Sequence, residues 1–313
     1  AYQDAKNPRR PIAVLANFAN HYHGGTSMLS PDYFGMFAER MAHEITTEFA
    51  DWNGPPPVVA MSQGTSGDVW LYDYFNPGPR KRPDIEPYTD GLVQLAAQAY
   101  QRISYRDQGV TVAMAQAELP LRYRVPDKQR LEWAQRVVEE MGDRLPKNTT
   151  EVYAQEQIIL HEKQSTKIVL QTARIGSIGF TAMPNEVYAL TGLKLKAMSP
   201  LQPTVNIGDL AITALPNEVY GITGLKLKLQ SPLPAIFNIE LANGAEGYIP
   251  PPEQHPLGGY NTWAARSAGL EVQAEPKIVE TVTQLLEKVA GRPRRVVKQN
   301  DGSAAKAIID TKP

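Results

Sequence analysis

Two histidines separated by one residue precede a double glycine in the segment NFANHYHGGTSM, residues 17–28. The segment before them, RPIAVLANF, is an apolar run typical of a strand buried on both faces. In an extended chain, side chains two residues apart point to the same side, so His21 and His23 can both reach one metal ion. The alternative is that each is a hydrogen-bonded polar residue at the end of a strand.

A second polar cluster, SQGTSGD at residues 62–68, follows the expected strand PPVVAMS. Its small residues can present backbone N–H groups to an anion or an oxyanion, with Asp68 orienting a ligand or a base. The alternative is a tight turn closed by a side-chain cap. The segment matches neither a phosphate-binding loop nor a Gly-x-Ser-x-Gly elbow, so nucleotide binding and a serine triad are unsupported.

Two further clusters contain carboxylates and tyrosines. Two PNE segments place Glu186 and Glu218 where helices are expected to begin, a position that suits a carboxylate with or without a metal. The segment LANGAEGYIPPPEQHPLGGYNTW holds Tyr248, His255 and Tyr260 around a triple proline, which restricts the chain as a preorganised site requires. A well-packed proline loop is the alternative. All four clusters follow expected strands, and ligands of open α/β sheets bind at the carboxyl ends of strands.

The elements that position these clusters follow from hydrophobic periodicity. Apolar runs alternate with amphipathic patterns, which predicts an α/β or α+β fold with a layered mixed β-sheet and flanking helices. We expect an exposed loop at residues 74–87, one α/β domain over residues 1–291 and a peripheral tail over 292–313. The expected helices cover 30–45, 90–103, 125–143, 150–162 and 275–291, and the expected strands cover 10–18, 56–62, 109–116, 167–175 and 235–241.

An internal repeat occupies the middle of the chain. Residues 175–206 and 207–238 align without gaps and are identical at more than half of their positions. Each copy is expected to form a strand, a PNE turn and a helix. Two copies are too few for a solenoid, so we interpret the repeat as a local duplication within a larger domain.

Composition narrows the class of protein. The 313 residues carry 32 basic and 33 acidic side chains, a balance that predicts no general attraction to nucleic acid or to an anionic membrane. No cysteine is present, so a metal site must use His, Asp, Glu, Tyr or water. No apolar segment approaches the roughly 18 residues of a membrane span. Because the chain begins with Ala1, we expect that it was trimmed or processed.

Taken together, LANGAEGYIPPPEQHPLGGY, the PNEVYALTGLKLK segment, NFANHYHGGTSM and MSQGTSGD resemble the neutral/alkaline (non-lysosomal) ceramidase family, in particular its poorly characterised bacterial branch. The resemblance extends from about Pro11 to Arg294. It implies a zinc amidase in which a metal-activated water attacks the amide of an N-acyl (sphingo)lipid or a related small-molecule amide. It also suggests a secreted or periplasmic protein.

The resemblance further implies a metal held by two histidines, a glutamate and a tyrosine. It assigns His21 as one histidine, Glu218 or Glu186 as the glutamate, and Tyr248 as the tyrosine. We expect Glu218, because only one strand separates its PNE turn from Tyr248. His23 is expected at the surface, since the double glycine turns the chain away.

Two residues are expected to act on the substrate in this interpretation. The resemblance assigns Tyr260 as a substrate-contacting tyrosine, and Asp68 is the carboxylate available to orient a base.

The chain also departs from the family pattern. No His-x-His motif lies upstream of the first strand, so we expect the chain to lack the family's N-terminal part. Gly67, Asp68, Val69 and Trp70 stand where characterised ceramidases have Gly-Asp-Val-Ser. We therefore expect zinc to bind weakly or not at all, and an inactive binding or structural domain is the alternative function.

Overall fold

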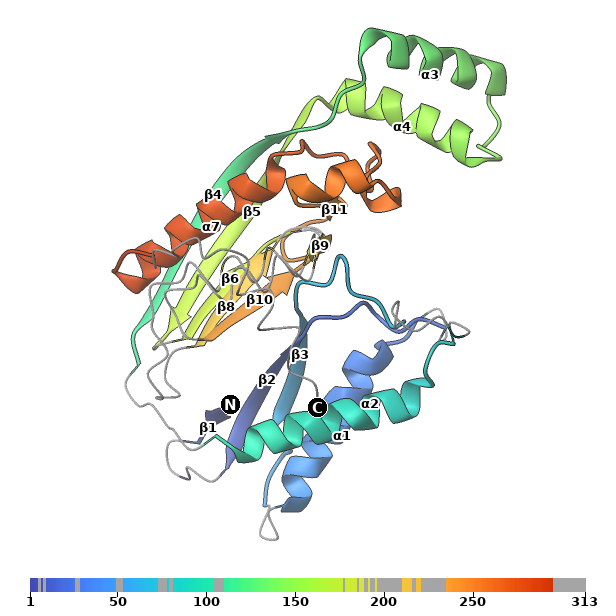
Figure 1. The fold of residues 1–313 in the computed structure, drawn as a ribbon. Coiled ribbons are helices and arrows are strands. Elements are labelled where there is room, and N and C mark those ends of the chain that lie inside the picture. The colour runs from blue at the N-terminus through green and yellow to red at the C-terminus, as the bar shows by residue number, and fades with distance from the viewer. Residues whose placement is uncertain are drawn as a thin grey trace.

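A computed structural model describes most of the chain. The residues that it does not describe are 5–6, 8–9, 26–28, 49–52, 73–77, 79–80, 104–109, 177, 185, 189–190, 192–194, 196–209, 216–217, 221–234 and 295–313. In several strands of the repeat region it gives the backbone alone. The remainder forms mixed sheets with flanking helices, and the expected fold class is confirmed (Figure 1).

The first sheet carries the histidine segment. Its strands have the order β1-β2-β3, and β2 runs parallel to β3. Two helices pack together on it, burying Phe37, Met41, Ile45 and Val93 against the strands. The helical spacing of the first three predicted this face. The elements are β1 (Tyr2–Gln3), β2 (Pro11–Phe18), α1 (Asp32–Glu48), β3 (Val58–Gln63) and α2 (Ile85–Gln101).

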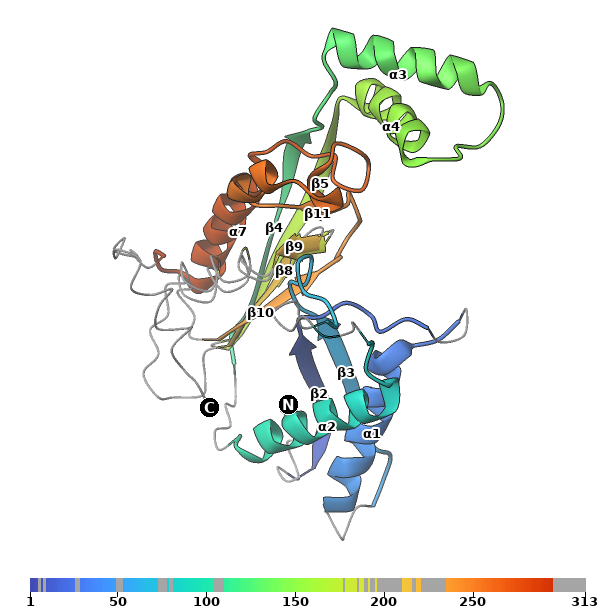
Figure 2. The same ribbon diagram turned by 45° about the vertical axis from the view of Figure 1, so that its right-hand side comes forward.

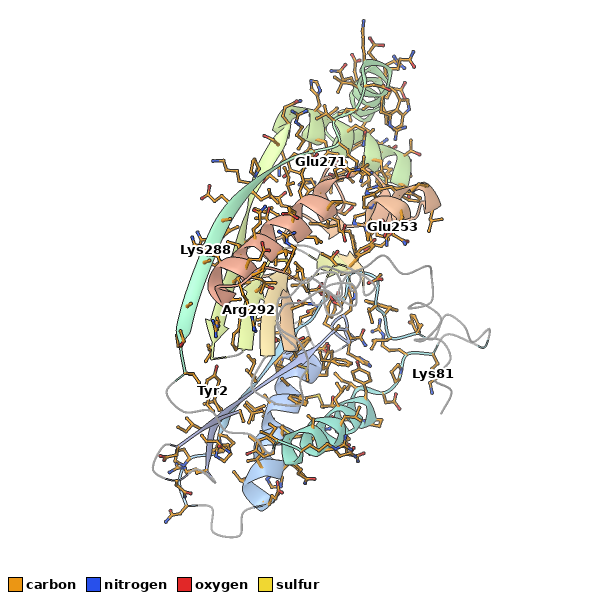
Figure 3. The ribbon with its side chains drawn as sticks, turned by 60° about the vertical axis from the view of Figure 1, so that its left-hand side comes forward. Tyr2, Lys81, Glu253, Glu271, Lys288 and Arg292 are labelled. Atoms are coloured by element: carbon orange, nitrogen blue, oxygen red, sulfur yellow. The ribbon has the colours of Figure 1, made fainter. Side chains whose placement is uncertain are left out.

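The second sheet holds the larger core. Its order is β4-β5-β6-β10-β8, with β10 parallel to β6 and β8. The last helix lies across β4 and β5 and buries Ile278, Val282 and Leu286. Glu271, just before that helix, accepts the backbone N–H of Arg122 and so joins the helix to the end of β4 (Figure 3). The elements are β4 (Val112–Arg122), β5 (Ser165–Ile175), β6 (Ile178–Ala182), β8 (Leu210–Leu215), β10 (Ala235–Glu240) and α7 (Ala274–Ala290).

A helical hairpin extends from the end of the long β4–β5 pair, far from the first sheet (Figure 2). It consists of α3 (Lys128–Met141) and α4 (Thr149–Lys163). Both helices begin at side-chain caps, because Asp127 accepts the N–H of Arg130 and Asn148 accepts the N–H of Glu151. The expected helices at 125–143 and 150–162 are therefore present.

Three short strands near the triple proline form a closed parallel arrangement. They are β7 (Glu186–Tyr188), β9 (Glu218–Tyr220) and β11 (Tyr248–Ile249), and they are followed by the 3-10 helices η1 (Pro252–Leu257) and η2 (Tyr260–Thr262). Glu186 and Glu218 were expected to begin helices, and this was wrong. Each begins a strand, because each backbone pairs with Tyr248 of β11.

Several element boundaries also differ from the expected ones. β4 continues beyond residue 116 through Pro120, which an edge strand tolerates because the missing N–H faces outward. α2 begins at Ile85 rather than at residue 90, since Pro87 lies in the first turn, where no N–H is needed. The start of the expected tail packs onto α7, as Arg294 pairs with Glu280 and Glu287 at 2.6 and 3.0 Å.

Side chains near the carboxyl ends of β2 and β3 join the two large sheets. Asn17 donates from Nδ2 to the carbonyl oxygen of Asn238 in β10 at 2.9 Å. Gln63, at the end of β3, donates to the carboxylate of Glu240 at 2.8 Å. The ends of β2, β3 and β10 therefore meet, as expected for clusters that follow strands. Within the described residues, no helix is long and apolar enough to cross a membrane.

Candidate functional site

His21 is the third residue after β2 and is nearly buried, with 8% of its surface exposed. Its Nδ1 donates to the carbonyl oxygen of Val69 at 2.7 Å. Its ring meets Trp70 edge-on, with 4.8 Å between centroids. A histidine whose Nδ1 is held by a carbonyl binds a metal through Nε2, so this orientation fits the ligand role expected for His21.

The segment around His21 is fixed by two polar side chains. Asn20 accepts the N–H of His21 at 2.9 Å and donates to the hydroxyl of Tyr88 at 2.8 Å. The buried carboxylate of Asp32 accepts the N–H groups of His23 and Gly24, each at 2.8 Å. Asp32 has a φ of 53°, and these bonds offset the cost of that left-handed backbone.

His23 is buried, with 6% of its surface exposed, so the expectation that it lies at the surface was wrong. Its Nδ1 is 2.9 Å from the carbonyl oxygen of Gly24, and its Nε2 is 2.7 Å from that of Pro83. The double glycine turns the chain inward here, onto the segment before α2. Both ring nitrogens are thus directed at backbone carbonyls, and this geometry gives His23 a structural role.

The loop after β3 binds a carboxylate of the protein itself. Glu240, at the end of β10 and 3% exposed, accepts the N–H of Ser66 at 2.9 Å and also the Ser66 hydroxyl. Gln63 donates to both Ser66 and Glu240, each at 2.8 Å. We expected the backbone N–H groups of this loop to bind an anion. The carboxylate that accepts the N–H of Ser66 belongs to Glu240 of the protein itself. Sequence reasoning missed Glu240, although an acidic residue at the end of a buried strand was a signal. Asp68, the expected orienting carboxylate, is exposed in the turn that follows.

Tyr248 and Tyr260 meet through their hydroxyl groups. The Tyr260 hydroxyl donates to that of Tyr248, and the two rings are edge-on with centroids 5.1 Å apart. Tyr248 is buried and Tyr260 is half exposed. Gly247, before Tyr248, has a φ of 80°, and a Cβ there would lie 2.2 Å from the backbone of Ser267. Only glycine lets Tyr248 approach so closely to the segment after η2.

A partly buried arginine holds the loop that carries Tyr260. Arg124 donates to the carbonyl oxygen of Thr262 at 2.7 Å and to that of Ala268. Its Nη1 lies 3.4 Å from Nδ1 of His255. Burial lowers the pKa of Arg124 to about 10, while burial and the nearby Arg124 charge lower the pKa of His255 to about 4. His255 is therefore neutral at pH 7 and supports the loop.

The structure brings together only part of the expected metal site. Tyr248 pairs through its backbone with both Glu186 and Glu218, but the side chains of these glutamates lie outside the described residues. Among the residues whose side chains are described, no group of three or more His, Asp or Glu is arranged to hold a metal ion. The assignment of His21, Glu218 and Tyr248 as ligands stays a prediction.

Comparison with known proteins gives a match in fold. No protein-family model and no curated protein matches the sequence. A ceramidase complexed with C2 has a TM-score of 0.54 and 14% identity, covering 95% of this chain and 48% of that chain. Neutral ceramidase from Pseudomonas aeruginosa has a TM-score of 0.50 and 14% identity, covering 94% and 47%. This chain spans about half the length of either structure, and identity this low establishes the fold alone.

Proposed function

We propose that this chain is a ceramidase-like, zinc-dependent hydrolase that cleaves the amide of an N-acyl (sphingo)lipid or a related amide. The observation that carries the proposal is the hydroxyl pair of Tyr248 and Tyr260, the two tyrosines that the sequence resemblance selects. The held orientation of His21 supports it, and so does the fold shared with two ceramidases.

The proposed roles follow from the chemistry of each side chain. His21 through Nε2, Glu218 through its carboxylate and Tyr248 through its phenolic oxygen would hold the metal, a donor set of nitrogen and oxygen that zinc accepts. A zinc ion held there would activate a water as nucleophile and polarise the amide carbonyl. Tyr260 donates to Tyr248 and thereby stabilises negative charge on the phenolic oxygen. Because half of its surface is exposed, Tyr260 can also contact a substrate.

One experiment tests this function directly. The purified 313-residue chain is loaded with zinc and dialysed against zinc-free buffer, its metal content is measured, and release of fatty acid from an N-acyl sphingosine is followed across added zinc concentrations. We expect zinc to be lost on dialysis and little or no hydrolysis without excess zinc, because a phenol must lose its proton to bind and one histidine and one glutamate hold the ion weakly until it does. His21→Ala is expected to abolish the zinc-dependent hydrolysis.

A catalytically inactive binding or structural domain is the second candidate. Two observations favour it: Trp70 stands where the resemblance expects a serine, and the N–H of Ser66 already binds Glu240. Absence of hydrolysis and of zinc binding at every zinc concentration would select this candidate. Stoichiometric zinc retained through dialysis, with full zinc-dependent hydrolysis, would instead refute the expected weak binding.

A further inference from the structure

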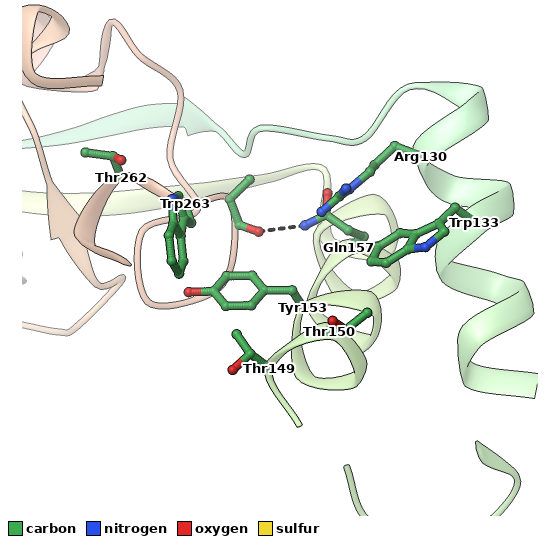
Figure 4. Close-up of a pocket in the computed structure, with 9 residues that line it drawn as sticks. Arg130, Trp133, Thr149, Thr150, Tyr153, Gln157, Thr262 and Trp263 are labelled. Carbon is green, nitrogen blue, oxygen red and sulfur yellow. Dashed lines mark hydrogen bonds between the residues drawn. The ribbon is translucent and has the colours of Figure 1, made fainter. Parts of the chain in front are cut away.

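A cavity of about 620 Å³ lies between the α3–α4 hairpin and the segment that follows η2 (Figure 4). Ligand pockets of proteins have volumes of about 300–1,000 Å³, so this cavity is large enough for a small organic molecule. Gln157 of α4 donates to the carbonyl oxygen of Ala264 at 2.6 Å and fixes the two walls against each other. The cavity is therefore formed by elements that are already joined.

Three aromatic side chains line this cavity, one from each of the elements around it. Trp133 comes from α3, Tyr153 from α4 and Trp263 from the segment after η2. The rings of Tyr153 and Trp263 meet edge-on with centroids 5.5 Å apart. Trp263 remains 47% exposed, although so large an apolar surface is normally buried. Exposed aromatic surface inside a cavity is suited to packing against the flat face of a ligand.

A cation lies beside these rings without an acidic partner. The guanidinium of Arg130 sits over the ring of Trp133, 4.2 Å from its centroid. Within the described part of the chain, no carboxylate pairs with that guanidinium. The two glutamates on the adjoining turns of α4 are already engaged, Glu151 by Arg144 and Glu156 by Arg266, each at 2.7 Å. Arg130 is thus available to a ligand carboxylate.

Hydroxyl groups complete the lining. Those of Thr149, Thr150 and Tyr153 face or border the cavity (Figure 4). Judged on the residues that the structure describes, none of these hydroxyls makes a hydrogen bond within the protein. An aliphatic chain placed here would remove them and Arg130 from water without replacement hydrogen bonds, which is unfavourable. A cationic ligand would meet Arg130, and the described residues that line the cavity include no acidic side chain.

We propose that this cavity binds a pyranose ring that carries a carboxylate, such as a uronic acid. The C–H face of the ring would pack on Trp263 and Tyr153, its hydroxyl groups would hydrogen-bond with Thr149 and Thr150, and its carboxylate would pair with Arg130. A planar guanidinium binds a carboxylate through two parallel hydrogen bonds, which gives the acidic sugar its advantage over a neutral one. The proposal stands independently of amide hydrolysis.

Titration of tryptophan fluorescence, with calorimetry as a second readout, tests the proposal on the intact chain. The probes are methyl β-D-glucuronide, methyl β-D-glucoside, acetate and adenosine monophosphate. We expect the glucuronide to bind about ten-fold more tightly than the glucoside, with acetate weaker than both. Equal affinity for the two glycosides, or tighter binding of the nucleotide, would overturn the proposal.

Three variants locate the binding. Arg130→Gln should remove the preference for the glucuronide while binding of the glucoside persists. Trp263→Ala should weaken both glycosides about ten-fold or more, and Trp263→Phe should restore part of that loss if the first variant folds poorly. Arg136→Gln, on the same helix but outside the cavity, is the matched control and should bind like the unmodified chain. Unchanged glucuronide affinity in Arg130→Gln would contradict the assignment.

Discussion

The hydroxyl of Tyr260 donates a hydrogen bond to the hydroxyl of Tyr248, so the exposed tyrosine of the proline loop supports the buried one. A partner that donates to a ligand oxygen tunes and orients that ligand, and loss of such a partner lowers metal affinity about 10- to 100-fold. In the proposed zinc site this hydrogen bond would join the two tyrosines in one function, and removing a single oxygen tests it.

Tyr260→Phe is expected to weaken zinc binding about ten-fold while the chain stays folded, because the Tyr248 oxygen loses its donor. Tyr248→Phe should weaken it further, since a ligand is lost. Competition with a fluorescent chelator measures both affinities. Tyr2→Phe, at the edge of the first sheet, is the control. If Tyr260→Phe and the unmodified chain bound zinc with equal affinity, Tyr260 would have no role in zinc binding by Tyr248.

Substitution of the two histidines of the first loop should have different effects on zinc binding. His21→Ala is expected to remove zinc binding and to cost about 1–3 kcal/mol of unfolding free energy, because the Val69 carbonyl that accepts from the buried ring loses its donor. His23→Ala should leave zinc binding intact but cost about 1–3 kcal/mol of unfolding free energy, because a backbone carbonyl that accepts from the buried ring loses its donor. Urea unfolding and metal content are measured on the same samples. The reverse pattern would exchange the two assignments.

The two glutamates opposite Tyr248 are distinguished by substitution. Glu218→Gln is expected to lower zinc affinity about ten-fold or more, and Glu186→Gln to leave it within about two-fold, since an amide is a poorer ligand than a carboxylate. Each variant is the natural control for the other, because both backbones pair with Tyr248. A larger effect at Glu186 would make the first copy of the repeat the metal-side copy.

Glu240 is predicted to hold the two sheets together. Glu240→Gln should cost about 2–3 kcal/mol of unfolding free energy, because an amide presents a donor toward Ser66 and Gln63, which also donate. Glu118→Gln, an exposed carboxylate on β4, should change stability by about 0.5 kcal/mol or less. Chemical denaturation measures both. A Glu240 variant as stable as the Glu118 variant would show that other contacts hold the sheets together.

His255 is expected to make stability depend on pH. Its pKa is lowered to about 4 in the fold by burial and by Arg124, so the unfolded chain takes up a proton first as the pH falls. Stability should therefore decrease from about pH 6.5 toward pH 4, by about 1–2 kcal/mol after allowance for partial exposure. Unfolding is measured between pH 7 and 5, above the range in which carboxylates titrate.

The matched variants for this prediction are His255→Gln and His161→Gln. The first should remove the slope, and the second, at an exposed position on α4, should keep it. A slope that survives in His255→Gln would assign the pH dependence to another group.

The sequence predicted the elements with strong local patterns and missed contacts between distant segments. The spacing of Phe37, Met41 and Ile45 is local information, and the helix that it predicts is present. Glu240 and Ser66 are separated by 174 positions, so no local sequence pattern predicts their hydrogen bond. The strand at Glu218 depends on backbone pairing with Tyr248, a distant partner that no local pattern around PNE identifies.

The hydrogen bonds from Arg124 to the loop beyond η1 affect the entropy cost of binding for any molecule that docks there. One guanidinium holds the carbonyl groups of Thr262 and Ala268, so the segment bearing Tyr260 and Trp263 is already ordered before an encounter. The conformational entropy of this segment is lost when the chain folds, so binding of a ligand does not have to order the segment. The entropy cost of binding at this segment is therefore expected to be lower than at a loop that becomes ordered only on contact.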